Sequence, residues 1–177
     1  MRDLKPTSLI VREGFKRACR DFTERVAPLG FRHTRRTLWP RPRFPTIQYV
    51  YFHRSGSTYG APRNHSVMIR VHFGIAVVGC GTEQGLTGPS SDAAHTVAGR
   101  YHLRFNAKSW STYDRCIEDL VRFVLEVGEP WFRDFEDPKA LLERADSPLD
   151  ERCKAAVRRA AAGNMTPHEV ATSFARF

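Results

Sequence analysis

Apolar residues alternate with other residue types along the segment from Val67 to Val77. Every odd-numbered position in it is Val, Ile or Phe. Side chains of a β-strand point alternately to its two faces, so this period of two predicts a strand with one buried face. The even-numbered positions carry Met68, Arg70 and His72 before smaller residues follow. We therefore expect a central strand whose second face presents a polar pair near its middle.

Further strands are expected on both sides of this one. Aromatic and β-branched residues fill residues 31–39 and 46–54, which predicts a long hairpin whose loop contains Pro40, Pro42 and Pro45. A shorter alternation over residues 101–105 predicts another strand. Between the later strands, residues 79–99 contain five Gly, so a long loop is expected there.

A period of three to four residues predicts helices at both ends of the chain. The first covers about residues 8–27. The second begins near Ser111, where a capping box with Asp114 is expected, and ends at Gly128 and Pro130. Three short helices follow, each opening with a capping residue directly before a proline. These pairs are Asp137-Pro138, Ser147-Pro148 and Thr166-Pro167.

This order predicts an α+β fold: an N-terminal helix, an antiparallel meander sheet of four strands or slightly more, and C-terminal helices packed on one face. Residues 1–177 form a single domain, in which residues 8–145 are the core unit and residues 147–177 an appended helical tail. With 177 residues and 41% apolar content, the chain needs no disulfide or metal to stabilise its core. No metal-ligand spacing or cofactor motif is present, so we expect neither a metal nor a cofactor.

The four cysteines lie 61, 36 and 37 residues apart and form no C-x-x-C pair. We expect four buried, reduced thiols. No apolar run reaches the roughly 18 residues of a membrane span, and the first residues lack the pattern of a secretion signal. The sequence therefore predicts a cytoplasmic protein that does not engage membranes.

Charge is distributed very unevenly along the chain. Residues 25–82 contain nine Arg, four His, no Lys, and neither Asp nor Glu, although the whole chain has 19 acidic residues and a net charge of +9. At the acidic frequency of the whole chain, this window would hold about six carboxylates. The composition therefore favours an anionic partner.

The strongest candidate site combines this stretch with the later strand. If the strands at 67–77 and 101–105 share a sheet with their apolar faces inward, four basic residues project from the opposite face. Arg offers a planar fork of donors that suits carboxylates and phosphates, and His titrates near neutrality. The pattern predicts a site for an anion or an acidic protein, formed by Arg70, His72, His102 and Arg104.

A simpler interpretation is that this is a solvated face whose cations pair with acids from the C-terminal helices. The acids expected to fold back over it are Asp114, Glu118 or Asp134.

The hairpin region supports a second hypothesis, because its Arg residues are interleaved with aromatic ones. Such surfaces bind single-stranded nucleic acids, where guanidinium groups meet phosphates and rings stack on bases. The residues concerned are Arg32, Arg35, Arg36, Trp39, Arg41 and Arg43. No known nucleic-acid-binding motif accompanies them, and the other interpretation is a hairpin whose aromatic residues face the core.

No catalytic motif is present, and we assign no catalytic residue. No serine lies in a G-x-S-x-G elbow, and the central region offers no carboxylate to orient a triad. A third hypothesis is an enzyme in which His72 or His102 is the general acid or base beside Arg70 and Arg104.

Several short motifs occur along the chain in an order that can be compared with known protein families. They are the helix that ends in Pro28-Leu29-Gly30-Phe31, the strand to Gly74, the segment Arg-Tyr-His-Leu-Arg at 100–104, Trp110, and Pro130-Trp131-Phe132 followed by Leu141 and Leu142. In this order the chain resembles a bacterial family catalogued as domain of unknown function 4304. The likeness covers about residues 8–145, and the long loop at 79–99 and the tail from 147 depart from it.

This resemblance implies a small cytoplasmic bacterial protein with no established enzymatic activity. It also implies a role like that of immunity or accessory proteins in conflict between bacteria. By the same resemblance, Arg100, Arg104 and Trp110 are candidate ligand- or partner-binding residues. The leading hypothesis from the sequence is thus a non-enzymatic binding protein that engages an acidic protein or a small anion through its basic sheet face.

Overall fold

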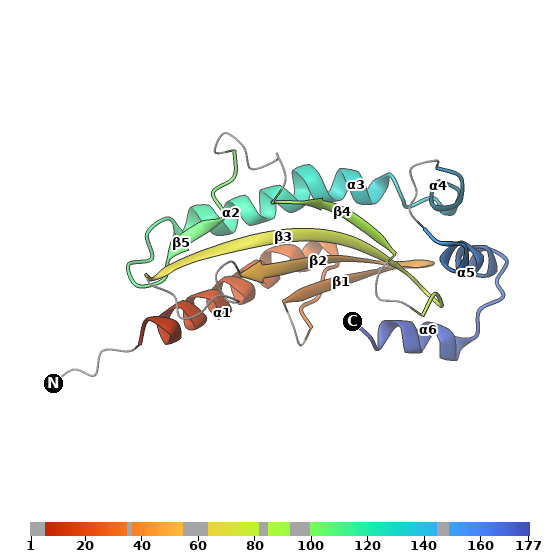
Figure 1. Cartoon of the computed structure of the whole chain (residues 1–177), viewed down its shortest axis with the longest axis horizontal. Helices are drawn as coiled ribbons and strands as arrows, with labels where there is room; N and C mark the ends of the chain where they lie inside the picture. The colour runs from red at the N-terminus through yellow and green to blue at the C-terminus, as the bar shows by residue number, and fades with distance from the viewer. Residues whose placement is uncertain (1–5, 35–36, 55–63, 82–84, 93–99, 145–148) are drawn as a thin grey trace.

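The computed structural model describes residues 6–34, 37–54, 64–81, 85–92, 100–144 and 149–177. An N-terminal helix, α1 (Thr7–Val26), is followed by an antiparallel sheet and then by further helices (Figure 1). The predicted α+β class and meander order are confirmed. Within the described residues, no helix is both long and apolar enough to cross a membrane.

Strand β3 (Ser66–Val77) is the centre of a five-stranded sheet with the order β1-β2-β3-β4. Along one edge it pairs with β2 (Thr46–Arg54), as its unbroken alternation predicts. Along the other edge, β4 (Leu86–Ser90) pairs with its second half and β5 (Arg104–Asn106) with its beginning. The strand predicted at 101–105 is therefore shorter and lies later in the chain.

The first strand differs from the sequence prediction. β1 (Leu38–Arg43) includes Pro40 and Pro42, which were expected in the loop, and the turn to β2 is only Phe44-Pro45, joined by a cis peptide bond. Because β1 is at the edge of the sheet, prolines at alternate positions cost it no hydrogen bond to a neighbour.

The expected long loop at 79–99 is also wrong, because β4 lies inside it. Gly85 and Gly88 allow close packing here and do not mark a loop. A Cβ on Gly85 would lie 2.5 Å from the carbonyl oxygen of Ile75, and one on Gly88 would lie 2.7 Å from the Trp131 ring. Only glycine lets the strand approach its neighbours this closely.

The second long helix does not end at Gly128 and Pro130 as predicted. α2 (Tyr113–Phe123) continues through a π-helical segment, η3 (Val124–Gly128), into α3 (Glu129–Arg133). A Cβ on Gly128 would lie 2.7 Å from the ring of Phe73, so this glycine is needed for packing. The wider π turn accommodates Pro130, which cannot donate a backbone hydrogen bond.

Some of the predicted caps of the later helices are present in the structure and others are not. The expected capping box at the start of α2 is wrong, since its N-cap, Thr112, has a φ of 63° and its side chain makes no capping hydrogen bond. Asp137 caps α4 (Pro138–Glu143), and Thr166 forms a capping box in α6 (Pro167–Phe174), as predicted. α5 (Glu151–Ala161) begins after the cap Asp150, and the expected Ser147-Pro148 start lies outside the described residues.

The main core lies between the sheet and the helices α1, α2 and α3. Its largest buried side chains are aromatic, among them Phe22, Phe73, Phe123 and Phe132. The last helix, α6, lies against the opposite face of the sheet. There Val170 and Phe174 belong to a small apolar cluster over Ile47, Ala76 and Val78. The rest of that face is not covered by α6.

The charged side chain of Arg41 is buried inside the core. Arg41, which is 3% exposed, donates from Nε and Nη2 to Gln48 Oε1 at 2.9 and 2.6 Å. Its Nη1 donates to the carbonyl of Leu29, the last residue of η1 (Ala27–Leu29), and lies 2.8 Å from Glu129 Oε1. The guanidinium also lies over the Phe31 ring, 4.2 Å from its centroid. Arg41 thereby joins β1, β2, η1 and α3.

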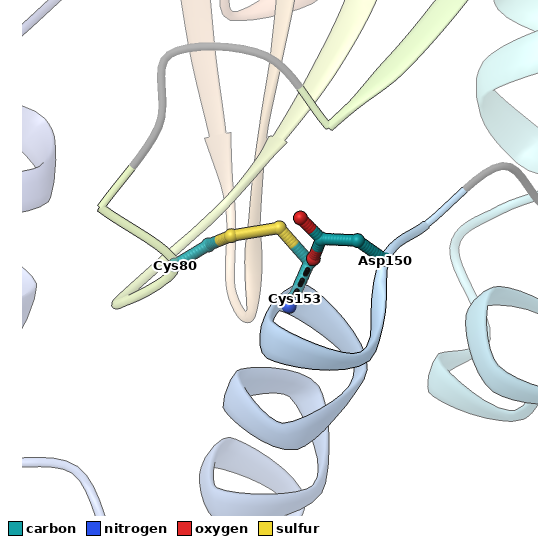
Figure 2. Close-up of side chains that lie close together, drawn as sticks. All are labelled: Cys80, Asp150 and Cys153. Atoms are coloured by element: carbon teal, nitrogen blue, oxygen red, sulfur yellow. Dashed lines mark hydrogen bonds between the residues drawn. A yellow bond between two sulfur atoms is a disulfide. The ribbon is translucent and has the colours of Figure 1, made fainter.

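A disulfide joins the turn after β3 to the first turn of α5. Cys80 and Cys153 are bonded, and the Asp150 carboxylate accepts from the backbone N–H of Cys153 (Figure 2). The expectation of four thiols is therefore wrong for this pair, because residues 73 apart in sequence are brought together by the fold. Cys19 and Cys116 remain buried thiols, and burial raises the pKa of each to about 12.

We predict that removing the disulfide lowers stability substantially. Cross-linking residues 73 apart removes denatured-state entropy that corresponds to about 4 kcal/mol of stability. The variant Cys80→Ser/Cys153→Ser should therefore lose up to about this free energy of unfolding in urea denaturation.

Reduced wild-type protein should unfold like this double variant, and a wild-type curve unchanged by dithiothreitol would contradict the prediction. A thiol count on protein trapped in acid from living cells should give two free thiols if the disulfide forms there, and four if it does not.

Arg41→Met should be strongly destabilising, because it leaves the Glu129 carboxylate without its cationic partner. Removing one member of a buried ion pair costs about 3–5 kcal/mol. Urea denaturation should show this loss, and Arg41→Met/Glu129→Gln should recover part of it. Arg43→Met, on the same strand but exposed, is the matched control and should change stability by less than about 0.5 kcal/mol. Equal effects of the two single variants would contradict a structural role for Arg41.

Candidate functional site

The part of the sheet face left uncovered by α6 is basic and aromatic. The β2–β3 register places Tyr51 opposite His72 and His53 opposite Arg70. Met68 follows on the same face of β3 and is 42% exposed. We call this surface the open sheet face and define it by Tyr51, His53, Met68, Arg70 and His72.

A cavity of about 390 Å³ adjoins the open sheet face where β3 meets the segment before β5. Ile69 donates from its backbone N–H to the carbonyl of Leu103, which fixes His102 and Arg104 beside β3. Three of the four basic residues predicted to share a face therefore line one cavity. We call it the polar hollow; its lining is Met68, Ile69, Arg70, Ser91, Asp92, Tyr101, His102, Leu103 and Arg104.

The fourth predicted residue, His72, contacts the same carboxylate as Arg70. Asp92 Oδ1 lies 3.1 Å from Arg70 Nε, and Asp92 Oδ2 lies 3.6 Å from His72 Nε2. These groups are partly exposed, so solvent screens the attraction. Part of the positive charge is thus neutralised by Asp92, and none of the three acids expected from the helices pairs with Arg70 or His72 within the described residues.

The surroundings of His72 disfavour its charged form. Burial lowers its pKa below the ordinary value of 6.5, and the neighbouring His53 and Arg70 lower it further, while Asp92 opposes them. The cation closest to Asp92 is the Arg70 guanidinium.

Arg100 belongs to a separate charge network with Arg122 of α2 and Glu126 of η3. Its Nη2 donates to Glu126 Oε2 at 2.9 Å, and the Tyr101 hydroxyl donates to the same oxygen at 2.6 Å. The hydrogen bonds from Tyr101, Arg122 and Arg100 lower the pKa of Glu126 despite desolvation. Arg100 is thus oriented toward a carboxylate and does not line the polar hollow.

Trp110 also lies apart from the polar hollow. Its ring, 39% exposed, is parallel to that of Phe105, and the Arg17 guanidinium lies 4.4 Å from its centroid. Its φ of 59° belongs to the tight turn that leads into α2. Of the three positions implied by the family resemblance, only Arg104 lines the hollow.

The residues of the nucleic-acid hypothesis do not share one surface. Trp39 is fully buried against Phe22 and Phe52, and Arg41 is in the core network. A buried ring cannot stack on a base. Arg32 and Arg43 are exposed, whereas Arg35 and Arg36 lie outside the described residues.

Sequence reasoning missed two carboxylates that shape this region. Asp92 follows a strand that was expected to be loop. Asp119, 4% exposed, accepts from the backbone N–H of His102 and pairs with Arg115 and Arg122. The three- and four-residue spacing of these charges on α2 could have identified Asp119 as a pairing residue.

One group of residues combines possible metal ligands. Ligand atoms of Cys80, Asp150 and Cys153 lie within 4.8 Å of one another (Figure 2). The two sulfurs are bonded to each other and the Asp150 carboxylate caps α5, so these donors are already engaged. A metal would need the thiolate forms.

We predict that His72 titrates below its ordinary pKa of 6.5, measured by NMR. Replacing Asp92 by Asn should lower the pKa further because it removes the opposing negative charge, whereas His53→Gln should raise it. Because the folded protein disfavours the charged imidazole, protonation of His72 should reduce stability as the pH falls below 6.5. A midpoint above 6.5 in the wild type would contradict this environment.

No protein-family model, curated protein or solved structure matches this chain significantly. The resemblance to domain of unknown function 4304 remains a prediction from short motifs.

Proposed function

We propose that this protein is a non-enzymatic binding protein that uses the polar hollow and the open sheet face to engage an acidic protein. The observation that carries this proposal is that Arg70, His102 and Arg104 line one hollow, in whose described lining Asp92 is the single carboxylate. The immunity-like or accessory role implied by the family resemblance is compatible with such a partner.

The chemistry of the hollow suits a carboxylate from the partner. Arg104 is exposed, and Arg70 is held at the mouth by a partly exposed contact with Asp92. An incoming carboxylate can bind Arg104 and compete with Asp92 for Arg70, since guanidinium groups donate two parallel hydrogen bonds to a carboxylate. Tyr51 beside the hollow and Met68 in its lining supply apolar contact area of the kind that is enriched in protein interfaces.

The other hypotheses receive less support from the geometry. Nucleic-acid binding loses the ring of Trp39 and the charge of Arg41, both of which are buried. An enzyme with His72 as general base would need an orienting hydrogen bond, and the 3.6 Å contact with Asp92 is too long for one. A free small anion remains the nearest alternative, because the same Arg residues would hold it.

We also propose that the protein is cytoplasmic, and the redox state of the Cys80–Cys153 pair in living cells tests this location. Reducing conditions in the cytosol keep most thiols free, so a Cys80–Cys153 bond found in living cells would contradict this location. The thiol count of protein trapped in acid separates the two possibilities.

The test compares two double variants that each remove two positive charges. Arg70→Ala/Arg104→Ala should weaken binding to immobilised poly-glutamate by about tenfold and should lose an acidic protein that the wild type retains from cells. Arg32→Ala/Arg43→Ala, the matched control, should retain both. Wild-type-like binding by a folded Arg70→Ala/Arg104→Ala variant would refute the proposal.

A single-stranded oligonucleotide tests the alternative. Salt-sensitive binding that is lost only in Arg32→Ala/Arg43→Ala would favour nucleic-acid recognition. Binding of inorganic phosphate alone, with no protein partner, would favour the small anion.

A further inference from the structure

A cavity larger than the polar hollow lies apart from it. It has a volume of about 920 Å³ and lies between α1 and the end of β2. β1 begins at Leu38, which pairs with Tyr51, so residues 52–54 of β2 extend beyond the strand beside them. We call this cavity the α1–β2 groove. Its volume is in the range of about 300–1,000 Å³ that is typical of small-molecule sites.

The floor of the groove is apolar. Phe15 is half-buried, Cys19 is 6% exposed, and Phe52 is 1% exposed. Burial raises the pKa of the Cys19 thiol to about 12, so it is neutral at physiological pH. The Thr23 hydroxyl is already engaged, because it accepts from Trp39 Nε1 and donates to the carbonyl of Cys19.

The rim of the groove is positively charged. Arg12, Lys16 and Arg20 lie four residues apart along α1, which places them on one side of the helix. Arg20 pairs with Asp21, but no ion pair among the described residues engages Arg12 or Lys16. Across the groove Arg54 adds another guanidinium, and Glu24 is the one carboxylate in the described lining.

We propose that the α1–β2 groove binds an amphipathic carboxylate, a small molecule with an apolar body and one anionic group. The body lies on the floor formed by Phe15, Cys19 and Phe52, where its burial is favourable. The anionic group lies at the rim, where Arg12 and Lys16 donate charge-assisted hydrogen bonds to it. A wholly apolar ligand would leave Arg12 and Lys16 without an anionic partner, and a small inorganic anion would leave the apolar floor exposed to water.

The test uses dodecanoate, whose binding is followed by displacement of the fluorescent probe 1-anilinonaphthalene-8-sulfonate. Dodecanoate should bind the full chain saturably with one site, and Arg12→Ala/Lys16→Ala should weaken it by about tenfold. Arg25→Ala/Lys108→Ala removes the same charge from exposed positions outside the groove and should bind like the wild type. The uncharged analogue 1-dodecanol should bind more weakly to the wild type and should be insensitive to Arg12→Ala/Lys16→Ala.

A second variant tests the floor. Phe15→Ala should weaken both dodecanoate and 1-dodecanol, with circular dichroism confirming that the variant is folded. Arg70→Ala/Arg104→Ala should bind dodecanoate normally, which separates this site from the polar hollow. The proposal is overturned if dodecanoate does not displace the probe, if the two charge variants bind equally well, or if 1-dodecanol binds as tightly as dodecanoate.

Discussion

The buried guanidinium of Arg41 is the interaction on which the arrangement of the sheet and helices depends. It donates to groups from β2 and η1 and pairs with Glu129 of α3. A buried charge is tolerated only when its donors are satisfied, so the edge hairpin, the turn after α1 and the start of α3 must take these positions together. Arg41 lies in the long stretch without carboxylates, and its acid comes from 88 residues later in the chain. Arg70 likewise pairs with Asp92, beyond that stretch, so charges that are separated along the sequence meet in the fold.

The two cavities place similar cations on different supports. In the polar hollow, Arg70 and Arg104 come from the sheet and the segment joined to it, and a carboxylate lies beside them. In the α1–β2 groove, Arg12 and Lys16 stand above an apolar floor. Guanidinium and ammonium groups bind anions in either setting, so the surrounding residues decide the class of ligand. The polar lining of the hollow suits a carboxylate on a protein surface, and the apolar floor of the groove suits an organic molecule.

Local patterns predicted the elements whose side chains alternate or repeat regularly. The period of two along residues 67–77 and 101–105 predicted that Arg70, His102 and Arg104 lie on one face, and all three line the polar hollow. The patterns failed where a residue's role is set by a distant partner: Pro40 and Pro42 are accepted because their strand is at an edge, and Gly88 and Gly128 make room for Trp131 and Phe73. The disulfide and the groove were not predictable for the same reason, since each is formed by segments far apart in the chain.

The disulfide has a further consequence for the last helix. α6 has no fully buried residue, and it lies over Ile47, Ala76 and Val78 mainly through partly buried side chains. Such a contact would be weak between separate molecules. Because Cys153 is fixed to Cys80, α6 is tethered close to this patch at a high effective concentration, which keeps a weak contact occupied. α6 thus occupies the apolar patch of Ile47, Ala76 and Val78 as an intramolecular ligand. A partner that binds the same patch would have to displace α6, which remains tethered nearby.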